Sequence, residues 1–295
     1  MGYQLWTSPL TGYRRRGTTF SELRLLFEKG FTTSSIFEPL QCCCIGDLID
    51  DVRAELKRLD YDYAGVIDPG ANQVIGWIQR EYLHEGSLND YLKPFLPQQL
   101  ISESTPLIEL IKILSSQENV YVVSRNGISG IVTRADLRKP PIRAMLFGLI
   151  SLLEMHLSYW IQYYYPNNTW EKYLAKSRIF KINQLLKARM ARNELISEVD
   201  CLQLCDKRDI IIKNKDLINK LGYKTKKSIN KTLKKIEYLR NRIAHSQNDI
   251  TENESWVGLS SDLEQIELIL YNSDKFVKKC SEGKDLSPTR LITVI

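Results

Sequence analysis

The short sequence LRNRIAH, residues 239–245, places an arginine, an asparagine and one of the chain's three histidines close together. Asn241 and His245 are about 40° apart around a helix axis, so Asn241 can orient His245. Arg240 lies about 140° from His245. Histidine exchanges a proton near neutral pH, and arginine binds anions. The structural alternative is that Arg and His near a helix C-terminus meet the helix dipole and cap free carbonyls.

The elements that must position this motif are helices. The stretch 225–246 carries an apolar stripe with spacings of 4, 3, 3 and 4 residues, which predicts a helix with one buried face. Residues 142–164 are apolar over most of a helical circumference, which predicts the central helix of a bundle. Two more helices are predicted over 168–189 and 191–211. The stripe consists of Ile229, Leu233, Ile236, Leu239 and Ile243.

Glu154 and His156 interrupt the most apolar segment, residues 144–161. Polar groups near the middle of a span are costly in a bilayer, so we expect a buried helix and no membrane span. Glu154 is a candidate supporting residue of the site, with a structural role as the alternative, and His156 is interpreted as a core histidine with a hydrogen-bond partner. The N-terminus lacks the apolar core of a secretory signal, so the expected location is the cytoplasm.

The Arg-Asn-x-x-x-His motif at residues 240–245 resembles the signature of the HEPN ribonucleases, an arginine, a polar residue and a histidine in this order. The resemblance covers about residues 142–270 and implies an all-α, HEPN-like bundle. It implies RNA cleavage by attack of the 2′-hydroxyl on the adjacent phosphate, which needs neither a protein nucleophile nor a metal. His245 would transfer the proton and Arg240 would stabilise the developing charge. A homodimer is implied, because two HEPN subunits commonly complete one site.

The first half of the chain contains an internal repeat. Each copy consists of a helix, a strand, a turn and a second strand, and the copies lie about 55 residues apart. Neither copy can bury a sheet face alone, so the two should pack into one α/β module. The predicted ranges are 46–59, 63–68 and 74–78 in the first copy, and 105–117, 120–124 and 128–133 in the second.

The second copy ends in GIVTRADLR, residues 130–138, which resembles the end of a CBS domain. In that family a glycine and two apolar residues close a strand, and Thr-x-x-Asp opens the next helix. The resemblance covers about residues 37–141 and implies a CBS pair that binds AMP, ADP, ATP or a related nucleotide as a regulatory ligand. It assigns the phosphate to Thr133, the ribose to Asp136, the base to Gly130 and Ile131, and a further contact to Thr105.

The pair Thr133 and Asp136 has a physical basis for nucleotide binding. A threonine at a helix start offers its hydroxyl beside free N–H groups and the positive end of the dipole, which suit a phosphate. An aspartate three residues later can accept from both ribose hydroxyls. The alternative is an ordinary N-cap pair, as in a capping box. The first copy has Gln79 and Tyr82 at the matching positions, so we expect one site per pair.

Charge is divided unevenly along the chain. Residues 1–141 carry 15 Lys and Arg against 17 Asp and Glu, whereas residues 142–295 carry 26 against 18. The basic half favours a polyanionic partner such as nucleic acid, although a lysine-rich helix surface is often only a solvated face. The arginine run is interpreted as solvated surface, with a phosphate contact as the alternative. It comprises Arg14, Arg15 and Arg16.

The six cysteines do not form paired CxxC motifs. We interpret them as buried free thiols, and we expect no metal site.

Together these features predict an α/β CBS pair followed by an all-α, HEPN-like helical bundle. The predicted parts are an N-terminal extension packed on the CBS pair (1–36), the CBS pair (37–141) and the helical domain (142–295). The break is placed at RKPPIR, residues 138–143, because paired prolines oppose helix continuation.

The predicted protein is a homodimeric, metal-independent endoribonuclease of toxin-like or antiviral-defence type, which needs no cofactor for catalysis and is regulated by the nucleotide. Two other classes stay open. The first is a non-catalytic sensor whose bundle serves for dimerisation or RNA binding. The second is a bundle that inhibits a partner protein.

Overall fold

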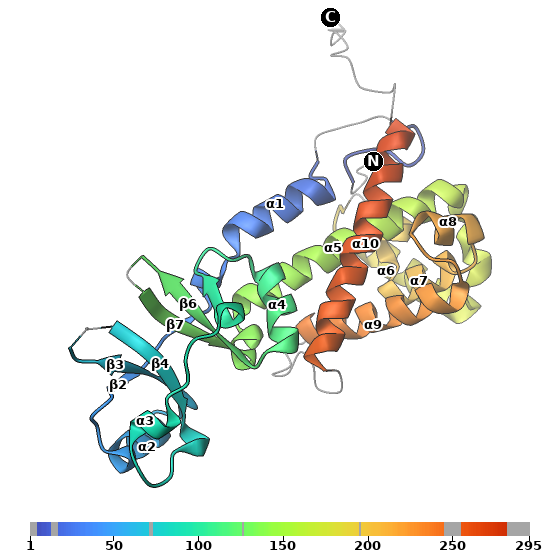
Figure 1. The fold of residues 1–295 in the computed structure, drawn as a ribbon. Coiled ribbons are helices and arrows are strands. Elements are labelled where there is room, and N and C mark those ends of the chain that lie inside the picture. The colour runs from blue at the N-terminus through green and yellow to red at the C-terminus, as the bar shows by residue number, and fades with distance from the viewer. Residues whose placement is uncertain are drawn as a thin grey trace, which may run out of the picture. The chain divides into compact units, whose positions relative to one another are not determined.

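The chain divides into two compact units in the computed structural model. The α/β unit consists of Phe27–Ile142 with Ser255–Val257, and the helical unit consists of Met1–Leu26, Arg143–Glu254 and Gly258–Ile295. Figure 1 shows the sheets of the first unit and the long helices of the second. The residues that the structure describes are 5–12, 17–70, 73–125, 127–194, 196–244 and 255–281.

Each copy of the repeat forms its own sheet in the α/β unit. In the first sheet, β2 pairs in parallel with β3, which pairs antiparallel with β4. In the second, β5 pairs in parallel with β6, which pairs antiparallel with β7, and β1 adds to the free edge of β7. The strands are β1 (Glu38–Pro39), β2 (Cys42–Cys44), β3 (Tyr63–Asp68), β4 (Gln73–Gln79), β5 (Leu100–Ser102), β6 (Asn119–Ser124) and β7 (Gly127–Thr133).

The two copies share details beyond their order of elements. The register shifts between Val66 and Ile67 in the first sheet and between Val122 and Val123 in the second. The internal repeat predicted from the sequence is therefore confirmed. The helices of this unit are α2 (Ile49–Arg58), α3 (Leu88–Tyr91) and α4 (Leu107–Ser116), with short 3-10 helices η1 (Thr33–Ser35), η2 (Arg80–Tyr82), η3 (Pro97–Gln99) and η4 (Arg134–Arg138).

Aromatic side chains join the two copies into one module. The rings of Trp77 in β4 and Tyr121 in β6 lie 5.8 Å apart between centroids, and Phe95 lies 4.7 Å from Tyr121. Such ring pairs stabilise a core beyond the area that they bury. The copies thus pack together as the repeat predicts.

The helical unit carries the predicted stripe in its core. All five apolar residues of the stripe in α9 are buried. Among the described residues, α5 is the one helix long and apolar enough to cross a membrane, and 67% of its most apolar window is buried within the protein, as in a core helix. The helices are α1 (Phe20–Gly30), α5 (Pro140–Tyr164), η5 (Pro166–Tyr173), α6 (Lys176–Met190), η6 (Glu198–Cys201), α7 (Leu204–Ile211), α8 (Lys215–Lys220), α9 (Lys226–Ala244) and α10 (Trp256–Ser281).

Two of the predicted helices are each divided. The range 168–189 contains the end of η5 and then α6, and the range 191–211 contains η6 and then α7. A local side-chain contact marks the start of η6, because Asp200 Oδ2 accepts from the Ser197 N–H at 2.7 Å, whereas α6 starts after Ala175 without a side-chain cap. Such N-terminal contacts compete with continuation of the preceding helix.

The paired prolines do not form a loop between the two halves. Pro140 and Pro141 are instead the first residues of α5. The first turn of a helix needs no intrahelical N–H donors, so proline is tolerated there.

The N-terminal segment is shared between the units, which differs from the predicted extension over residues 1–36. Residues up to Leu26 group with the helical unit, where the Phe20 N–H donates to Asp274 Oδ2 at 3.1 Å and Arg24 pairs with Glu267 at 2.9 Å. Thr33 instead belongs to the α/β unit, because its N–H donates to the Thr105 carbonyl at 2.8 Å. The arginine run at residues 14–16 lies outside the described residues.

Candidate functional site

A cavity of about 180 Å³ lies between the two copies of the repeat. Three of the predicted nucleotide contacts line it: Ile131 and Thr133 from β7, and Asp136 from η4. The first copy contributes residues at the start of β3 and just before it. The remaining lining residues are Glu38, Pro39, Gln41, Asp60, Tyr61, Asp62, Tyr63 and Ala135.

The Asp136 carboxylate already has three donors. Its Oδ2 accepts from the Thr133 N–H at 2.7 Å and from the Thr133 hydroxyl at 3.1 Å. Its Oδ1 lies 2.8 Å from Lys139 Nζ, and Lys139 also contacts Glu38. A carboxylate offers about four acceptor positions, so accepting from both ribose hydroxyls requires release of either the Thr133 hydroxyl or the Lys139 amine.

Lys139 is held firmly at this position. Burial alone would lower the pKa of Lys139, but hydrogen bonds to Asp136 and Glu38 outweigh burial and raise it. The amine is therefore positively charged at neutral pH. The contacts of Thr133 and Asp136 are also those of the N-cap pair that the sequence left as the alternative.

The electrostatic character of the cavity is acidic. Four carboxyl groups line it and, among the described residues, no Lys or Arg does. Arg80 and Lys139 compensate part of this charge, since Arg80 Nη2 lies 2.7 Å from Asp62 Oδ1 and Lys139 pairs with both Asp136 and Glu38. An acidic lining disfavours a ligand with several phosphate charges. The four carboxyl groups belong to Glu38, Asp60, Asp62 and Asp136.

Gly130 and Thr105 serve other contacts. A Cβ at Gly130 would lie 2.2 Å from Phe37 Cδ2 and 2.8 Å from the Glu38 carbonyl oxygen, so this glycine permits the close approach of β1 to β7. The Thr105 carbonyl accepts from the N–H and the hydroxyl of Thr33, at 2.8 and 3.0 Å. Neither residue is among the lining of the cavity.

Three of the four residues predicted for chemistry in the helical unit, Arg240, Asn241 and Glu154, form a contact cluster. Arg240 Nε lies 3.3 Å from Glu154 Oε1, and Arg240 Nη1 donates to Asn241 Oδ1 at 3.2 Å. Asn241 is therefore directed toward Arg240. His245, the predicted proton-transfer residue, lies outside the described residues. The arrangement fixes the Nε side of the guanidinium while the Arg240 side chain stays 40% exposed.

Lys207 belongs to this cluster and escaped the sequence analysis. Its Nζ donates to the Glu154 carbonyl at 3.1 Å and lies 3.8 Å from the Glu154 carboxylate. Burial lowers the pKa of Lys207, and the Glu154 carboxylate opposes this effect. In the sequence, Lys207 lies between two charged residues, a pattern that is typical of a solvent-exposed helix face. Its contact with Glu154 can therefore be recognised only in the folded chain, where Lys207 is buried. Glu154 thus stands between two cations, Arg240 and Lys207.

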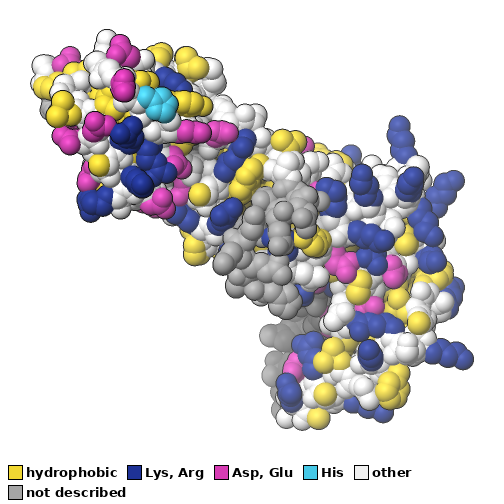
Figure 2. All heavy atoms as spheres, turned by 90° about the horizontal axis from the view of Figure 1, so that it is seen from below, with side chains coloured by type: hydrophobic (Ala, Val, Ile, Leu, Met, Phe, Trp, Pro, Cys, Tyr) yellow, Lys and Arg dark blue, Asp and Glu magenta, His cyan; other side chains and the backbone are white. Residues whose placement is uncertain are grey.

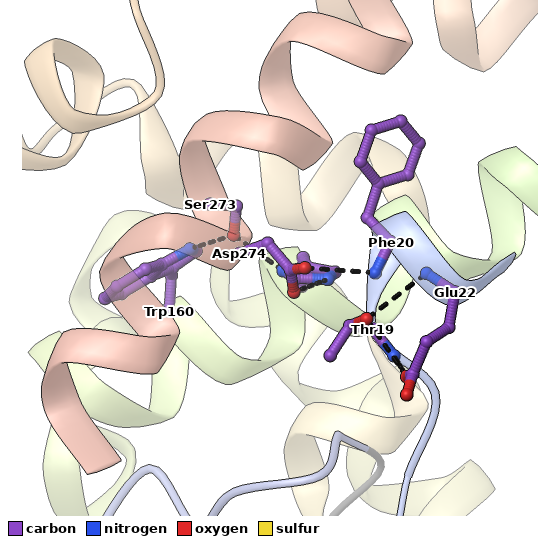
Figure 3. A network of polar contacts seen from close by, with 7 residues as sticks. Thr19, Phe20, Glu22, Trp160, Ser273 and Asp274 are labelled. Carbon is purple, nitrogen blue, oxygen red and sulfur yellow. Dashed lines mark hydrogen bonds and ion pairs between the residues drawn. The ribbon is translucent and has the colours of Figure 1, made fainter. Parts of the chain in front are cut away.

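His156 is a core histidine, as the sequence analysis interprets it. It is fully buried, and its Nδ1 lies 2.7 Å from Ser273 Oγ. Trp160 Nε1 donates to the same oxygen at 2.6 Å, and Figure 3 shows this contact beside Asp274, Phe20, Thr19 and Glu22. Burial lowers the pKa of His156 to about 3. The ring is therefore neutral near pH 7, and its 3.8 Å contact with Asp274 is not an ion pair.

The cysteines are free, but they are not uniformly buried as predicted. Cys201 is buried, whereas Cys44 is exposed and the other four are intermediate. Burial, followed by the charge of Asp47, raises the pKa of Cys43 to about 12. A thiol with so high a pKa is a poor nucleophile at neutral pH.

No protein-family model and no curated protein matches this chain. Solved structures that resemble part of it include OpuCA of Staphylococcus aureus (20% identity, TM-score 0.31, 35% of this chain and 92% of that chain). They also include CBSX2 in complex with AMP (20% identity, TM-score 0.32, 40% of this chain and 97% of that chain). A third structure contains the CBS domains of a transcriptional regulator from Streptococcus pneumoniae (18% identity, TM-score 0.32, 37% of this chain and 97% of that chain). At these identities and TM-scores the likenesses carry no conclusion about ligand or activity.

Proposed function

We propose that this chain is a nucleotide-responsive endoribonuclease. The α/β unit is a CBS pair that senses a nucleotide, and the helical unit is a HEPN-type bundle that cleaves RNA without a metal. Two observations carry the proposal: Thr133 and Asp136 line one cavity, and Arg240 contacts both Glu154 and Asn241. A toxin-like or antiviral-defence role in the cytoplasm suits a nuclease that stays inactive until a signal arrives.

The sensing site favours an adenine nucleoside or nucleoside monophosphate over a polyphosphate. Its volume of about 180 Å³ is below the usual range of about 300–1,000 Å³ for small-molecule pockets. A nucleoside part would enter the cavity, with Asp136 accepting from the ribose and Ile131 beside the base. Thr133 would donate to a single phosphate after releasing Asp136 Oδ2, which accepts from both its N–H and its hydroxyl, whereas the Arg134 N–H at the start of η4 donates to the Glu118 carbonyl at 3.2 Å.

Cleavage would use the 2′-hydroxyl of RNA as the nucleophile. The 2′-oxygen forms a bond to phosphorus, the bond to the 5′-oxygen breaks, and the products are a 2′,3′-cyclic phosphate end and a 5′-hydroxyl end. His245 transfers the proton in this step. The Arg240 guanidinium stabilises the extra negative charge, with its Nη2 group toward the phosphate, since its Nε side forms the ion pair with Glu154 and its Nη1 donates to Asn241.

A homodimer would complete the catalytic site, since one Arg and one His make a sparse constellation. The nucleotide then regulates cleavage if it binds one arrangement of the dimer better than another. A coupling free energy of about 1–3 kcal/mol is enough to change activity several-fold to about a hundredfold.

The test compares RNA cleavage by the wild type and by His245→Ala, with His84→Ala as the matched control because His84 is an exposed histidine of the α/β unit. We expect His245→Ala to cleave about 10²- to 10⁴-fold more slowly, since general acid–base catalysis contributes that much. His84→Ala should retain the wild-type rate. Equal cleavage by the wild type and His245→Ala would remove His245 from the chemistry.

A non-catalytic sensor is the second candidate, and one contact favours it. Glu154 pairs with both Arg240 and the buried Lys207, as in a network that only stabilises the bundle. In that case the wild type binds RNA or dimerises in response to the nucleotide, yet yields no 2′,3′-cyclic phosphate ends with or without adenosine, AMP or ATP.

A further inference from the structure

One face of α9 carries cationic and aromatic side chains in a continuous row. At 100° per residue, the positions 4, 7, 11 and 14 along a helix all fall within about 40° of position 0, so the five positions span about 80° of the circumference. Starting at Lys227, these positions are Lys231, Lys234, Tyr238 and Asn241. All five side chains are exposed, and the row extends for about 21 Å along the helix. We call these five residues the α9 track.

Within the described parts of the chain, no carboxylate neutralises the lysines of the α9 track. Lys227, Lys231 and Lys234 have no ion pair with any residue in the described ranges, whereas the adjacent Lys235 lies 3.4 Å from Asp262. The one acidic residue of α9, Glu237, contacts Arg208. Figure 2 shows many Lys and Arg side chains and few Asp and Glu side chains on one face of the helical unit.

Tyr238 is the aromatic member of the row and is held in place. Its ring is 42% exposed, and its hydroxyl accepts from Arg242 Nη1 at 2.7 Å. The Arg242 guanidinium carbon lies 5.3 Å from the ring centroid, and Arg242 itself is buried. A fixed, partly exposed aromatic ring next to exposed lysines suits stacking of a nucleobase.

We infer that the α9 track binds single-stranded RNA and leads it to the cluster of Arg240, Asn241 and Glu154. Lys227, Lys231 and Lys234 bind successive phosphates, and Tyr238 stacks on a base close to the scissile bond. A duplex cannot stack a base on Tyr238, so the track selects unpaired RNA. This inference rests on the proposed function for the position of the scissile bond, but not for the binding itself.

Binding is tested on a fluorescein-labelled 2′-O-methyl RNA 12-mer, which lacks the attacking hydroxyl and so reports binding apart from cleavage. The variant Lys227→Gln/Lys231→Gln/Lys234→Gln is compared with a matched triple in α6, Lys176→Gln/Lys181→Gln/Lys187→Gln, whose lysines are also exposed. We expect the α9 triple to bind at least about tenfold more weakly. Its slope of log K against log salt should shrink by about 2, at about 0.7 per lost phosphate contact.

The α6 triple should keep more than half of the wild-type affinity. Two results would overturn the inference: an unchanged affinity and slope for the α9 triple, or an equal loss for both triples. The latter would mean a diffuse basic surface in place of a track.

Tyr238 is tested with a pair of variants. Tyr238→Leu should lower affinity about fivefold or more, because loss of base stacking on an aromatic ring has an effect of that size. Tyr238→Phe keeps the ring and loses only the hydrogen bond from Arg242 to the hydroxyl, so it should bind like the wild type. Equal weakening in both variants would assign Tyr238 to folding and remove the stacking role.

The failure of this inference and of the proposed function are distinguishable. If the wild type binds the 12-mer through the α9 track but cuts no RNA, RNA binding by the track is supported and the proposed nuclease activity is contradicted. If the wild type cuts RNA and the triple variant of the α9 lysines has an unchanged KM for RNA, the proposed nuclease activity is supported and the role of the α9 track in binding is contradicted.

Discussion

The two units keep their polar groups in different places. In the α/β unit, Thr133 and Asp136 line a cavity, while the helix faces and strands around it bury apolar side chains. The helical unit instead encloses ionisable groups in its core. These include His156, Asp206, Lys207, Arg242 and Asp274, each no more than 5% exposed. Ligand binding should therefore depend on residues of the α/β unit. A strong pH dependence of the free energy of unfolding should come from residues of the helical unit.

The largest expected effect is an acid-dependent loss of stability through His156. Its folded pKa is about 3, whereas the unfolded value is about 6.5. Between these values the unfolded state binds more protons, so stability is present above about pH 6.5 and is lost as the pH falls. The slope is at most about 1.4 kcal/mol per pH unit. Asp274 works in the opposite direction, because burial raises its pKa.

Urea unfolding of the wild type, His156→Gln and His84→Gln between pH 7 and pH 4.5 checks this expectation. His156→Gln should have a lower stability at pH 7 and a flatter pH dependence. His84→Gln should follow the wild type. Parallel curves for His156→Gln and the wild type would show that the acid sensitivity comes from elsewhere.

Removal of the anion between Arg240 and Lys207 should have the next largest effect. Glu154→Ala leaves a buried ammonium without its carboxylate, which we expect to lower the free energy of unfolding by about 2 kcal/mol. Glu154→Ala/Lys207→Met removes both charges and should recover most of the loss. The measurement is urea unfolding followed by far-ultraviolet circular dichroism. A double variant as unstable as Glu154→Ala would mean that the pair is not coupled.

An exposed ion pair of the α/β unit gives the contrast. Glu55 and Arg58 of α2 form a surface pair at 2.6 Å, and Glu55→Ala should leave stability nearly unchanged because solvent screens such pairs. A loss like that of Glu154→Ala would break the distinction between the two units.

Ligand binding in the α/β unit should depend on Asp136. Asp136→Ala removes the ribose acceptor, and we expect AMP affinity to fall by at least about tenfold, in line with the loss of two hydrogen bonds to a charged group. Gln79→Ala changes the corresponding position of the first copy and should leave AMP binding intact. Calorimetric titration measures both, and a signal unaltered by Asp136→Ala would locate the ligand elsewhere.

The smallest effect should be the discrimination among phosphates. The acidic lining should make ATP bind a few-fold more weakly than AMP at low salt, and higher salt should narrow the difference because it screens exposed charges. Competition titrations with adenosine, AMP and ATP at two salt concentrations test this order. Tighter binding of ATP at low salt would contradict the electrostatic account of the cavity.

Local patterns predicted most of the α/β unit and the two long helices α5 and α9 of the helical unit. The predicted strand over 63–68 has the same bounds as β3, and the stripe in α9 is buried as expected. α10 was not predicted, although it has 26 residues. Its buried face includes Asp262, Ser273 and Asp274 among apolar residues. Polar residues on the inner face hide the periodicity from which a helix is inferred.

The repeat, the Thr133 and Asp136 pair and the spacing of Arg240 to Asn241 can be read from the sequence alone, because each depends on residues close together in the chain. In contrast, the position of Glu154 between Arg240 and Lys207, and that of Lys139 between Glu38 and Asp136, follow from the folded chain. These contacts join residues about 50 to 100 positions apart. Charge neutralisation and burial depend on distance in space, which local patterns of residues do not encode.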